Sequence, residues 1–130
     1  MSLRSRAAAL TLLVAWLGAG CDGPPSGPGS LLVTVEATSA PLGAATLEVV
    51  GSGIRGFEGM GSTHAYGGLV SARQSRHRVV LLDPDGGMLQ VAVRVDDVRA
   101  APPRVSVIAA AGTDDLERTH ADVEVRIEGT

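Results

Sequence analysis

The sequence predicts an all-β fold, a small antiparallel β-sandwich, and three observations carry that prediction. Apolar and polar residues alternate with a period of two over several short segments, which is typical of strands with one buried face. Clusters of Asp, Pro and Gly separate these segments, and no segment sustains a helical period. The 130 residues fit one domain, whose core must consist of aliphatic residues because the chain has one Trp, one Tyr and one Phe.

Two strands are expected near the start of the domain. In residues 31–37 the side chains expected to face the core are Leu31, Val33, Val35 and Ala37. Thr34 and Glu36 lie between them and are expected to face solvent. The pattern repeats in residues 45–49, where the inward-facing side chains are Ala45, Leu47 and Val49.

Further strands are expected in the second half of the chain. RHRVVLL, residues 76–82, is apolar on both faces, as in a strand near the middle of a sheet. The clearest alternation is in MLQVAVRVD, residues 88–96, whose inward-facing side chains are Leu89, Val91, Val93 and Val95. Residues 105–109 and 123–127 alternate in the same way, with the inward-facing side chains Val105, Val107, Ala109, Val123, Val125 and Ile127.

Two stretches have no sustained period. Residues 51–76 are rich in glycine, and we expect one or two irregular strands or a long loop there. They begin with GSGIRG, which matches G-x-G-x-x-G but lacks the following helix and the later acidic residue of a dinucleotide site, so a glycine loop is expected. TDDLERTH, residues 113–120, is expected to form a polar loop or one helical turn capped by Thr113.

The first 20 residues have the three-part plan of a secretory signal. Arg4 and Arg6 precede an apolar run over residues 7–17, and small residues follow it. A helix needs about 20 apolar residues to span a bilayer, so a retained transmembrane anchor is the weaker interpretation. We therefore expect residues 1–20 to be a cleaved signal peptide.

The one cysteine of the chain follows directly, in LGAGC, residues 17–21. This segment resembles the lipobox of bacterial lipoprotein precursors, although Gly18 stands where that family has a large aliphatic residue. The resemblance implies that Cys21 becomes the first mature residue and carries acyl chains, such as palmitate, that anchor the protein to a membrane of the bacterial cell envelope. The alternative is ordinary cleavage near Gly20, which would leave a secreted periplasmic protein with a free thiol.

DGPPSGPGS, residues 22–30, is expected to be a disordered spacer, because its prolines and glycines form no core. The predicted organisation is therefore a lipoprotein signal peptide over residues 1–20, the lipidated cysteine and its Pro/Gly linker over residues 21–30, and the β-sandwich over residues 31–130.

The order of segments from residue 78 to residue 128 resembles the back half of cohesin-type β-sandwiches. RVVLLDPDGGMLQVAVRV comes first, and VSVIAAAGTDDLERTHADVEVRI follows as two strands around a polar loop. The resemblance implies an immunoglobulin-like or cohesin-like sandwich and an envelope or surface location. The front half of the chain does not match, so dockerin binding is not carried over.

Candidate ligand-binding residues lie in and after the glycine-rich stretch. Tyr66 could contact a glycan, and Arg73 and Arg76 in SARQSRHR could contact an anion or a lipid headgroup or could simply be solvated. Asp83 and Asp85 in DPDGG are placed as in some calcium loops, but calcium takes six to eight oxygen ligands. We favour the interpretation that DPDGG is a turn joining two strands. The three histidines show no paired metal-ligand spacing, so no metal site is expected.

Charge and motifs restrict the function. Without Arg4 and Arg6 the formal charge of −3 becomes −5, and no basic cluster along the sequence points to nucleic acid or an anionic membrane surface. No nucleophile motif or cofactor motif is present. We expect a non-catalytic protein-interaction or structural module without a cofactor, anchored to a membrane through Cys21. The alternative is a β-sandwich that binds a glycan or a cell-wall polymer.

Overall fold

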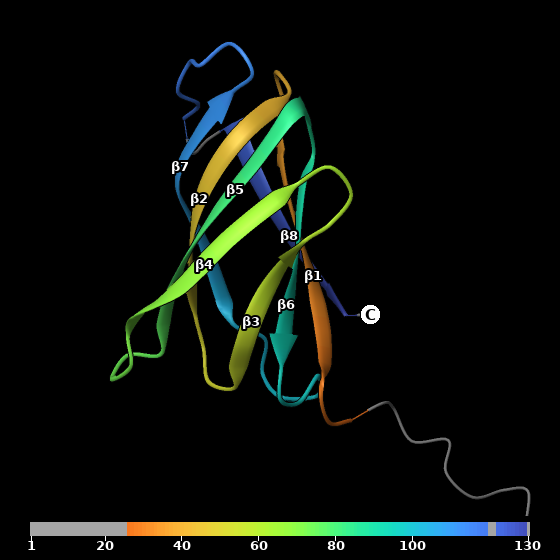
Figure 1. Cartoon of the computed structure of the whole chain (residues 1–130), viewed down its shortest axis with the longest axis vertical. Coiled ribbons are helices and arrows are strands. Elements are labelled where there is room, and N and C mark those ends of the chain that lie inside the picture. Colours follow the sequence, from red (N-terminus) through yellow and green to blue (C-terminus); the bar gives the residue numbers. More distant parts are fainter. Residues whose placement is uncertain (1–25, 120–121, 130) are drawn as a thin grey trace, which may run out of the picture.

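The computed structural model describes residues 26–119 and 122–129. Within them the chain forms eight strands, shown in Figure 1: β1 (Gly29–Ala37), β2 (Leu42–Val50), β3 (Ile54–Gly59), β4 (His64–Ser71), β5 (Arg76–Gly87), β6 (Leu89–Val95), β7 (Arg104–Gly112) and β8 (Val123–Gly129). They form two four-stranded antiparallel sheets that pack face to face. The predicted antiparallel β-sandwich is confirmed.

The two sheets share one plan of strand pairing. Sheet A has the order β3-β6-β1-β8 and sheet B the order β4-β5-β2-β7. The chain therefore pairs as one long folded hairpin, in which β1 lies beside β8, β2 beside β7, β3 beside β6 and β4 beside β5. Every connection except the β4–β5 turn crosses from one sheet to the other, so loops gather at the two ends of the sandwich.

The core lies between the sheets and is aliphatic. The inward faces predicted for β1, β2 and β6 are confirmed, and the buried hydrophobic residues of the core are Leu31, Val33, Val35, Leu42, Ala45, Leu47, Val49, Val79, Leu81, Leu89, Val91, Val93, Val95 and Ala110. Val and Leu supply most of this area, which fits strands whose branched side chains pack across a pleated surface.

Thr34 departs from its expected exposure. It points to the outer face of sheet A, as predicted, but it is 4% exposed. β1 is a central strand, and the neighbours of Thr34 in register are Gln90 on β6 and Arg126 on β8. Two long side chains flank the short threonine, so an outward position in the middle of the sheet becomes buried.

The predicted inward orientation of Ala109 is wrong because β7 contains a bulge. Leu47 of β2 pairs with Val107, whereas Thr46 pairs with Ala109, so Ile108 is an extra residue in the ladder. After the bulge the alternation is inverted: Ala109 is exposed and Ala110 is buried. One inserted residue moves every later side chain to the other face of a strand.

The prediction for residues 76–82 is right in position and wrong in burial. β5 lies between β4 and β2, as expected for a central strand. However, Val80 is 36% exposed and Leu82 is 40% exposed, because no further layer covers the outer face of sheet B within the described residues. A central strand is buried on both faces only where both faces are covered.

The glycine-rich residues 51–76 hold the two strands that one of the expectations allowed, β3 and β4. GSGIRG forms a turn and the start of β3, and no helix follows it, which fits a glycine loop. Gly53 has a φ of +73°, a left-handed conformation that glycine adopts without strain.

The expected helical turn capped by Thr113 is wrong. Residues 113–119 form a loop that returns to β7 through a bridge between Glu117 and Ala111. Asp114, one residue further along, accepts the local hydrogen bond, from the Leu116 amide at 3.1 Å. An Asx turn thus replaces the capped helix.

Candidate functional site

Several exposed apolar residues gather on the outer face of sheet B. One row across its four strands consists of Tyr66, Val80, Thr46 and Ala109, and the next row of His64, Leu82, Ala44 and Ala111. Tyr66 is 63% exposed, and Ile108 in the β7 bulge is 41% exposed. The outer face of a solvated antiparallel sheet normally alternates to polar residues, so this face departs from the pattern.

Small residues hollow this face into a groove. Ala44 and Thr46 of β2 form its floor, with Ala109 and Ala111 of β7 beside them, and the hollow has a volume of about 250 Å³. Val80 of β5 forms one wall. A second hollow of about 260 Å³ shares Ala44 and Ala111 and extends along Gly43 and Pro84. We call the two together the alanine groove.

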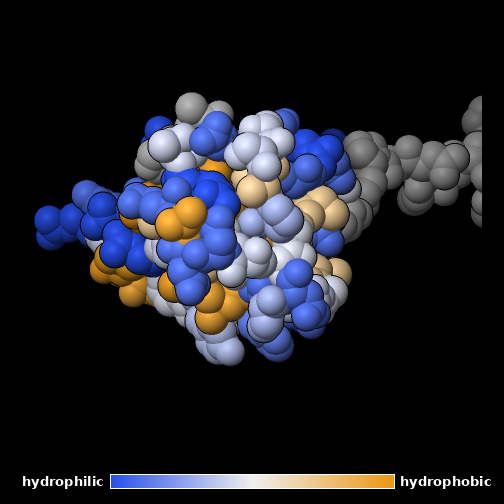
Figure 2. All heavy atoms as spheres, turned by 90° about the horizontal axis from the view of Figure 1, so that it is seen from above, coloured by the Kyte–Doolittle hydropathy of each residue, from blue (hydrophilic) through white to orange (hydrophobic). Residues whose placement is uncertain are grey.

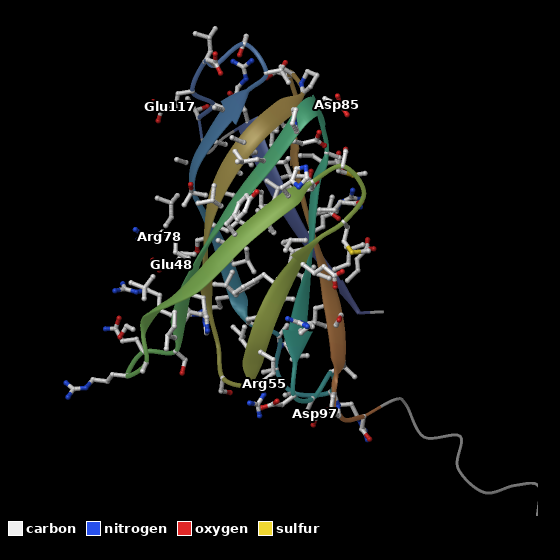
Figure 3. The ribbon with its side chains drawn as sticks, viewed as in Figure 1. Glu48, Arg55, Arg78, Asp85, Asp97 and Glu117 are labelled. Carbon is white, nitrogen blue, oxygen red and sulfur yellow. The ribbon has the colours of Figure 1, made fainter. Side chains whose placement is uncertain are left out.

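The loop 113–119 forms an acidic rim on the other side of the groove. Asp115 and Glu117 line the hollow, and neither forms an ion pair with another described residue. Glu117 is labelled at the top of Figure 3, next to the end of β7. The rim therefore presents two exposed carboxylates beside an apolar floor.

Hydrogen bonds hold the loop that carries this rim. The Asp114 carboxylate accepts from the Leu116 amide and from Arg118 Nη2 at 2.9 Å, and the Arg118 amide donates to the Ala110 carbonyl at 2.8 Å. The Leu116 amide first, and then the Arg118 guanidinium, lower the pKa of Asp114 below the ordinary value of an aspartate. The positions of Asp115 and Glu117 are therefore set by their own loop before any partner binds.

Asp83 is engaged by other groups of the protein. Asp83 is 3% exposed and accepts hydrogen bonds from Ser62 Oγ at 2.8 Å and from the Asp85 amide at 3.0 Å. Among the described residues no three His, Cys, Asp or Glu side chains lie close enough to hold a metal ion. The predicted turn is found as the irregular end of a strand: DPDGG forms the last five residues of β5, and Met88 alone separates it from β6 in the other sheet.

The structure separates Tyr66 from the two predicted arginines. Tyr66 lies opposite Val80, four residues along β5 from Arg76, a distance of about 13 Å at 3.3 Å per residue. Arg73 is exposed in the β4–β5 turn, and Arg76 Nη1 lies 4.0 Å from Glu48 Oε2. Tyr66 therefore belongs to the outer face of sheet B and the arginines to one end of the sandwich.

A separate hollow, of about 400 Å³, lies at the flank between β3 and β4. Phe57 and His77 form its inner wall with ring centroids 5.7 Å apart. Gly67 is required there, because a Cβ atom at this position would lie 2.5 Å from Phe57 Cδ2. Arg55 and Arg94 also line this hollow, and Arg55 is paired with Asp96. The residue types gave no sign of this hollow, because its lining comes from four strands.

The predicted lipidation site, Cys21, lies outside the described residues, as do the signal peptide and the first part of the linker. β1 begins at Gly29, two residues before the predicted start of the domain. In the described part of the chain, no helix is long and apolar enough to cross a membrane.

Comparisons with known proteins add no relative. No protein-family model matches the chain, and neither the curated proteins nor the solved structures contain a match.

Proposed function

We propose that the chain is a bacterial envelope lipoprotein, anchored through acylated Cys21, whose β-sandwich is a non-catalytic module that docks a protein partner on the outer face of sheet B. The anchor is supported by the charged start, the apolar run and the small residues that precede the one cysteine. The linker of Pro, Gly and Ser between Cys21 and β1 suits a domain held a short way off a bilayer.

The exposed apolar face of sheet B is the observation that carries the docking proposal. Val80, Leu82 and Tyr66 stand on it in neighbouring rows, and the alanine groove lies beside them. Exposed apolar area of this kind is costly in water and is typical of surfaces that bind other proteins. Its aliphatic lining suits association rather than bond-making chemistry.

The groove and its rim define the chemistry of the partner. A floor of alanines admits small or medium apolar side chains, and Asp115 and Glu117 favour a basic residue next to them. We therefore expect a protein segment that presents an apolar residue to the groove and an Arg or Lys to the rim.

A glycan partner is the second candidate, because Tyr66 exposes most of its ring on the same face. An exposed aromatic ring is a stacking surface for a sugar. Retention of the protein on a polysaccharide resin that disappears in Tyr66→Ala would favour this candidate over a protein partner.

The anchor is tested by the intact mass of the protein recovered from bacterial membranes, with and without Cys21→Ser. We expect a mature chain that starts at Cys21 and carries acyl groups, and we expect both the acyl mass and the membrane association to be lost in the variant. An unmodified mass in a soluble fraction would refute the anchor.

The docking face is tested by placing a photo-crosslinking amino acid at Leu82 in the intact cell envelope. The matched control is Glu58, which is exposed on the outer face of sheet A. We expect one defined protein adduct at position 82 and none at position 58. Glu117→Lys should weaken the adduct, whereas Glu124→Lys, on β8, should leave it unchanged. Equal labelling from both faces would refute the proposal.

A further inference from the structure

The charged residues of the domain divide between its two ends. The first end, where β1 begins, holds the loops 51–53, 72–75 and 96–103, and we call it the tether end. Strand register places these loops together, because Gly29 pairs with Val95, while Val50 pairs with both Arg76 and Arg104. The opposite, distal end holds the loops after β1, β3, β5 and β7.

The two ends have opposite charge. At the tether end the basic residues are Arg55, Arg73, Arg76, Arg94, Arg99 and Arg104, and the acidic residues are Asp96, Asp97 and Glu128. At the distal end the acidic residues are Asp83, Asp85, Asp114, Asp115, Glu117 and Asp122. Arg118 is the one arginine at the distal end among the described residues. In Figure 3, Arg55 is labelled near the bottom of the domain, and Asp85 and Glu117 near the top. Seen from above, the distal end presents mainly hydrophilic residues (Figure 2).

Half of the tether-end arginines have no acidic partner, since Arg99 is attracted to the Asp97 carboxylate of its own loop. Arg55 pairs with Asp96, and Arg76 approaches Glu48. The other three are exposed, and none forms an ion pair with another described residue: Arg73, Arg94 and Arg104. Unpaired, solvated guanidinium groups remain available to an external anion.

Asp97 at this end is engaged by the backbone. Its carboxylate accepts hydrogen bonds from the Arg99 amide at 2.9 Å and from the Gly27 amide at 3.2 Å. The bond from the Gly27 amide holds the incoming chain against the loop 96–103, together with the bond that the Val98 amide donates to the Gly27 carbonyl at 3.0 Å. The segment that leads back toward Cys21 is therefore fastened among the arginines.

The β4–β5 turn adds exposed apolar residues to the same end. Leu69 is 58% exposed and Val70 is 48% exposed, directly before the turn that carries Arg73. Surfaces that bind the interface of a bilayer combine basic and apolar side chains in this way, since the first bind headgroups and the second enter the acyl boundary.

We infer that the tether end binds the anionic headgroups of the membrane in which the lipid anchor sits. Arginine binds the phosphate oxygens of lipids with its planar fork, and the anchor keeps this end within a linker length of the bilayer. The acidic distal end is repelled by the same surface, so the long axis of the domain stands upright. The acidic rim of the alanine groove then faces away from the membrane. This inference rests on the proposed lipid anchor.

The inference is tested with the acylated protein, purified from membranes and reconstituted in vesicles of phosphatidylcholine with or without phosphatidylglycerol. A donor fluorophore is attached through Gln74→Cys at the tether end or through Ser39→Cys at the distal end, and energy transfer to an acceptor dye on the lipid is measured. We expect phosphatidylglycerol to raise transfer from position 74 and not from position 39. High salt should remove the rise, because it screens exposed charges.

Two triple variants, both with the label at position 74, separate location from net charge. Arg73→Gln with Arg99→Gln and Arg104→Gln lowers the net charge by three at the tether end and should abolish the rise. Ser39→Glu with Met88→Glu and Thr113→Glu lowers it equally at the distal end and should keep the rise. Each arginine near an anionic surface strengthens association by about fivefold, so loss of three is well within detection. An unchanged rise in the first variant, or no rise in the unaltered protein, would overturn the inference.

The intact mass of the same preparation separates this inference from the anchor. If no acyl group is present, the anchor proposal fails, and the tether end is tested alone by flotation of the unacylated chain with the two kinds of vesicle. Flotation with phosphatidylglycerol vesicles that the tether-end triple variant loses supports the inference. Absence of flotation overturns it.

Discussion

The outer faces of the two sheets are built on the same pairing plan but differ in chemistry. On sheet A the outward residues include Glu36, Gln90 and Arg126, and Arg126 pairs with Glu36 across neighbouring strands. On sheet B the corresponding central positions are Val80 and Thr46, followed by an alanine groove. Both faces are outermost among the described residues. Sheet B also carries an ion pair, Arg78 with Glu48 at 3.9 Å, in the row next to Val80 and Thr46, so its apolar part is confined to the rows of Tyr66 and His64.

This difference teaches that the two faces serve separate purposes. The inner faces of both sheets are mainly aliphatic, with Phe57 and His77 at one flank, and supply the core. The outer faces therefore only have to be compatible with the pairing of the strands. On sheet A the outer face carries polar side chains, among them the ion pair of Arg126 with Glu36. The apolar residues of sheet B contribute little to the core, so their exposure is better explained by binding than by stability.

The largest expected effect tests the inner faces that both outer faces depend on. Val93→Asp places a charge at a position that is 0% exposed, between Leu31 and Phe57 in register, and should lower the free energy of unfolding by more than about 4 kcal/mol. Arg94→Asp, one residue later on the exposed face, should change it little. Urea unfolding followed by circular dichroism measures both, and equal tolerance would mean that the register is wrong.

The next effect compares the inner and outer faces of sheet B on one strand. Leu81 is 0% exposed, so Leu81→Ala should destabilise by about 2–5 kcal/mol. Leu82 is 40% exposed, so Leu82→Ala should cost less than about 1 kcal/mol. The same unfolding assay separates the two variants. A large loss in Leu82→Ala would show that sheet B is covered by something that stabilises the domain.

A smaller effect compares the outer faces directly. Arg126→Ala removes the exposed pair with Glu36 and should cost about 0.2–1 kcal/mol, and this cost should shrink at high salt. Val80→Thr on sheet B changes a half-exposed side chain for one of similar shape and should be near neutral at any salt concentration. If the change in unfolding free energy depended on salt in Val80→Thr and not in Arg126→Ala, the ion pair of Arg126 with Glu36 would not stabilise sheet A.

The smallest effect is the dependence on acid. The Arg99 and Gly27 amides lower the pKa of Asp97, and the Leu116 amide with Arg118 lowers that of Asp114, in both cases below 3.8. A carboxylate whose pKa is lower when folded stabilises the fold above 3.8, and this contribution disappears as the pH falls through the folded pKa. NMR titration should give midpoints below 3.8 for both groups. In Asp97→Asn and Asp114→Asn, less stability should be lost between about pH 5 and about pH 2.

The alternation of residues predicts much of the strand architecture because period two is a local property. Leu89, Val91, Val93 and Val95 needed no knowledge of their partners to be assigned to one face. The exposure of outer-face side chains was less predictable. Thr34 is buried by neighbours from β6 and β8, and Val80 is exposed because no described layer covers sheet B. Ala109 changes face because of a bulge that only the pairing of β2 with β7 reveals.

The candidate site shows the same division. Tyr66 was identified from the sequence as a candidate glycan contact, but its neighbours Val80 and Ala109 come from other strands. Arg73 and Arg76 were identified as two charges close together in SARQSRHR. Sequence alone gave no reason to join them with Arg55 and Arg104, which β-pairing places at the same end.

The sequence by itself determined the buried faces of β1, β2 and β6, because the period of two that marks them follows from spacing along the chain. Its N-terminal pattern likewise predicts the leader and Cys21. Only the tertiary structure decided that the outer face of sheet B is an open groove and that the arginines meet at one end. The physical reason is that each feature is made of side chains from several strands. These strands are distant along the chain and become neighbours only when the sheets form.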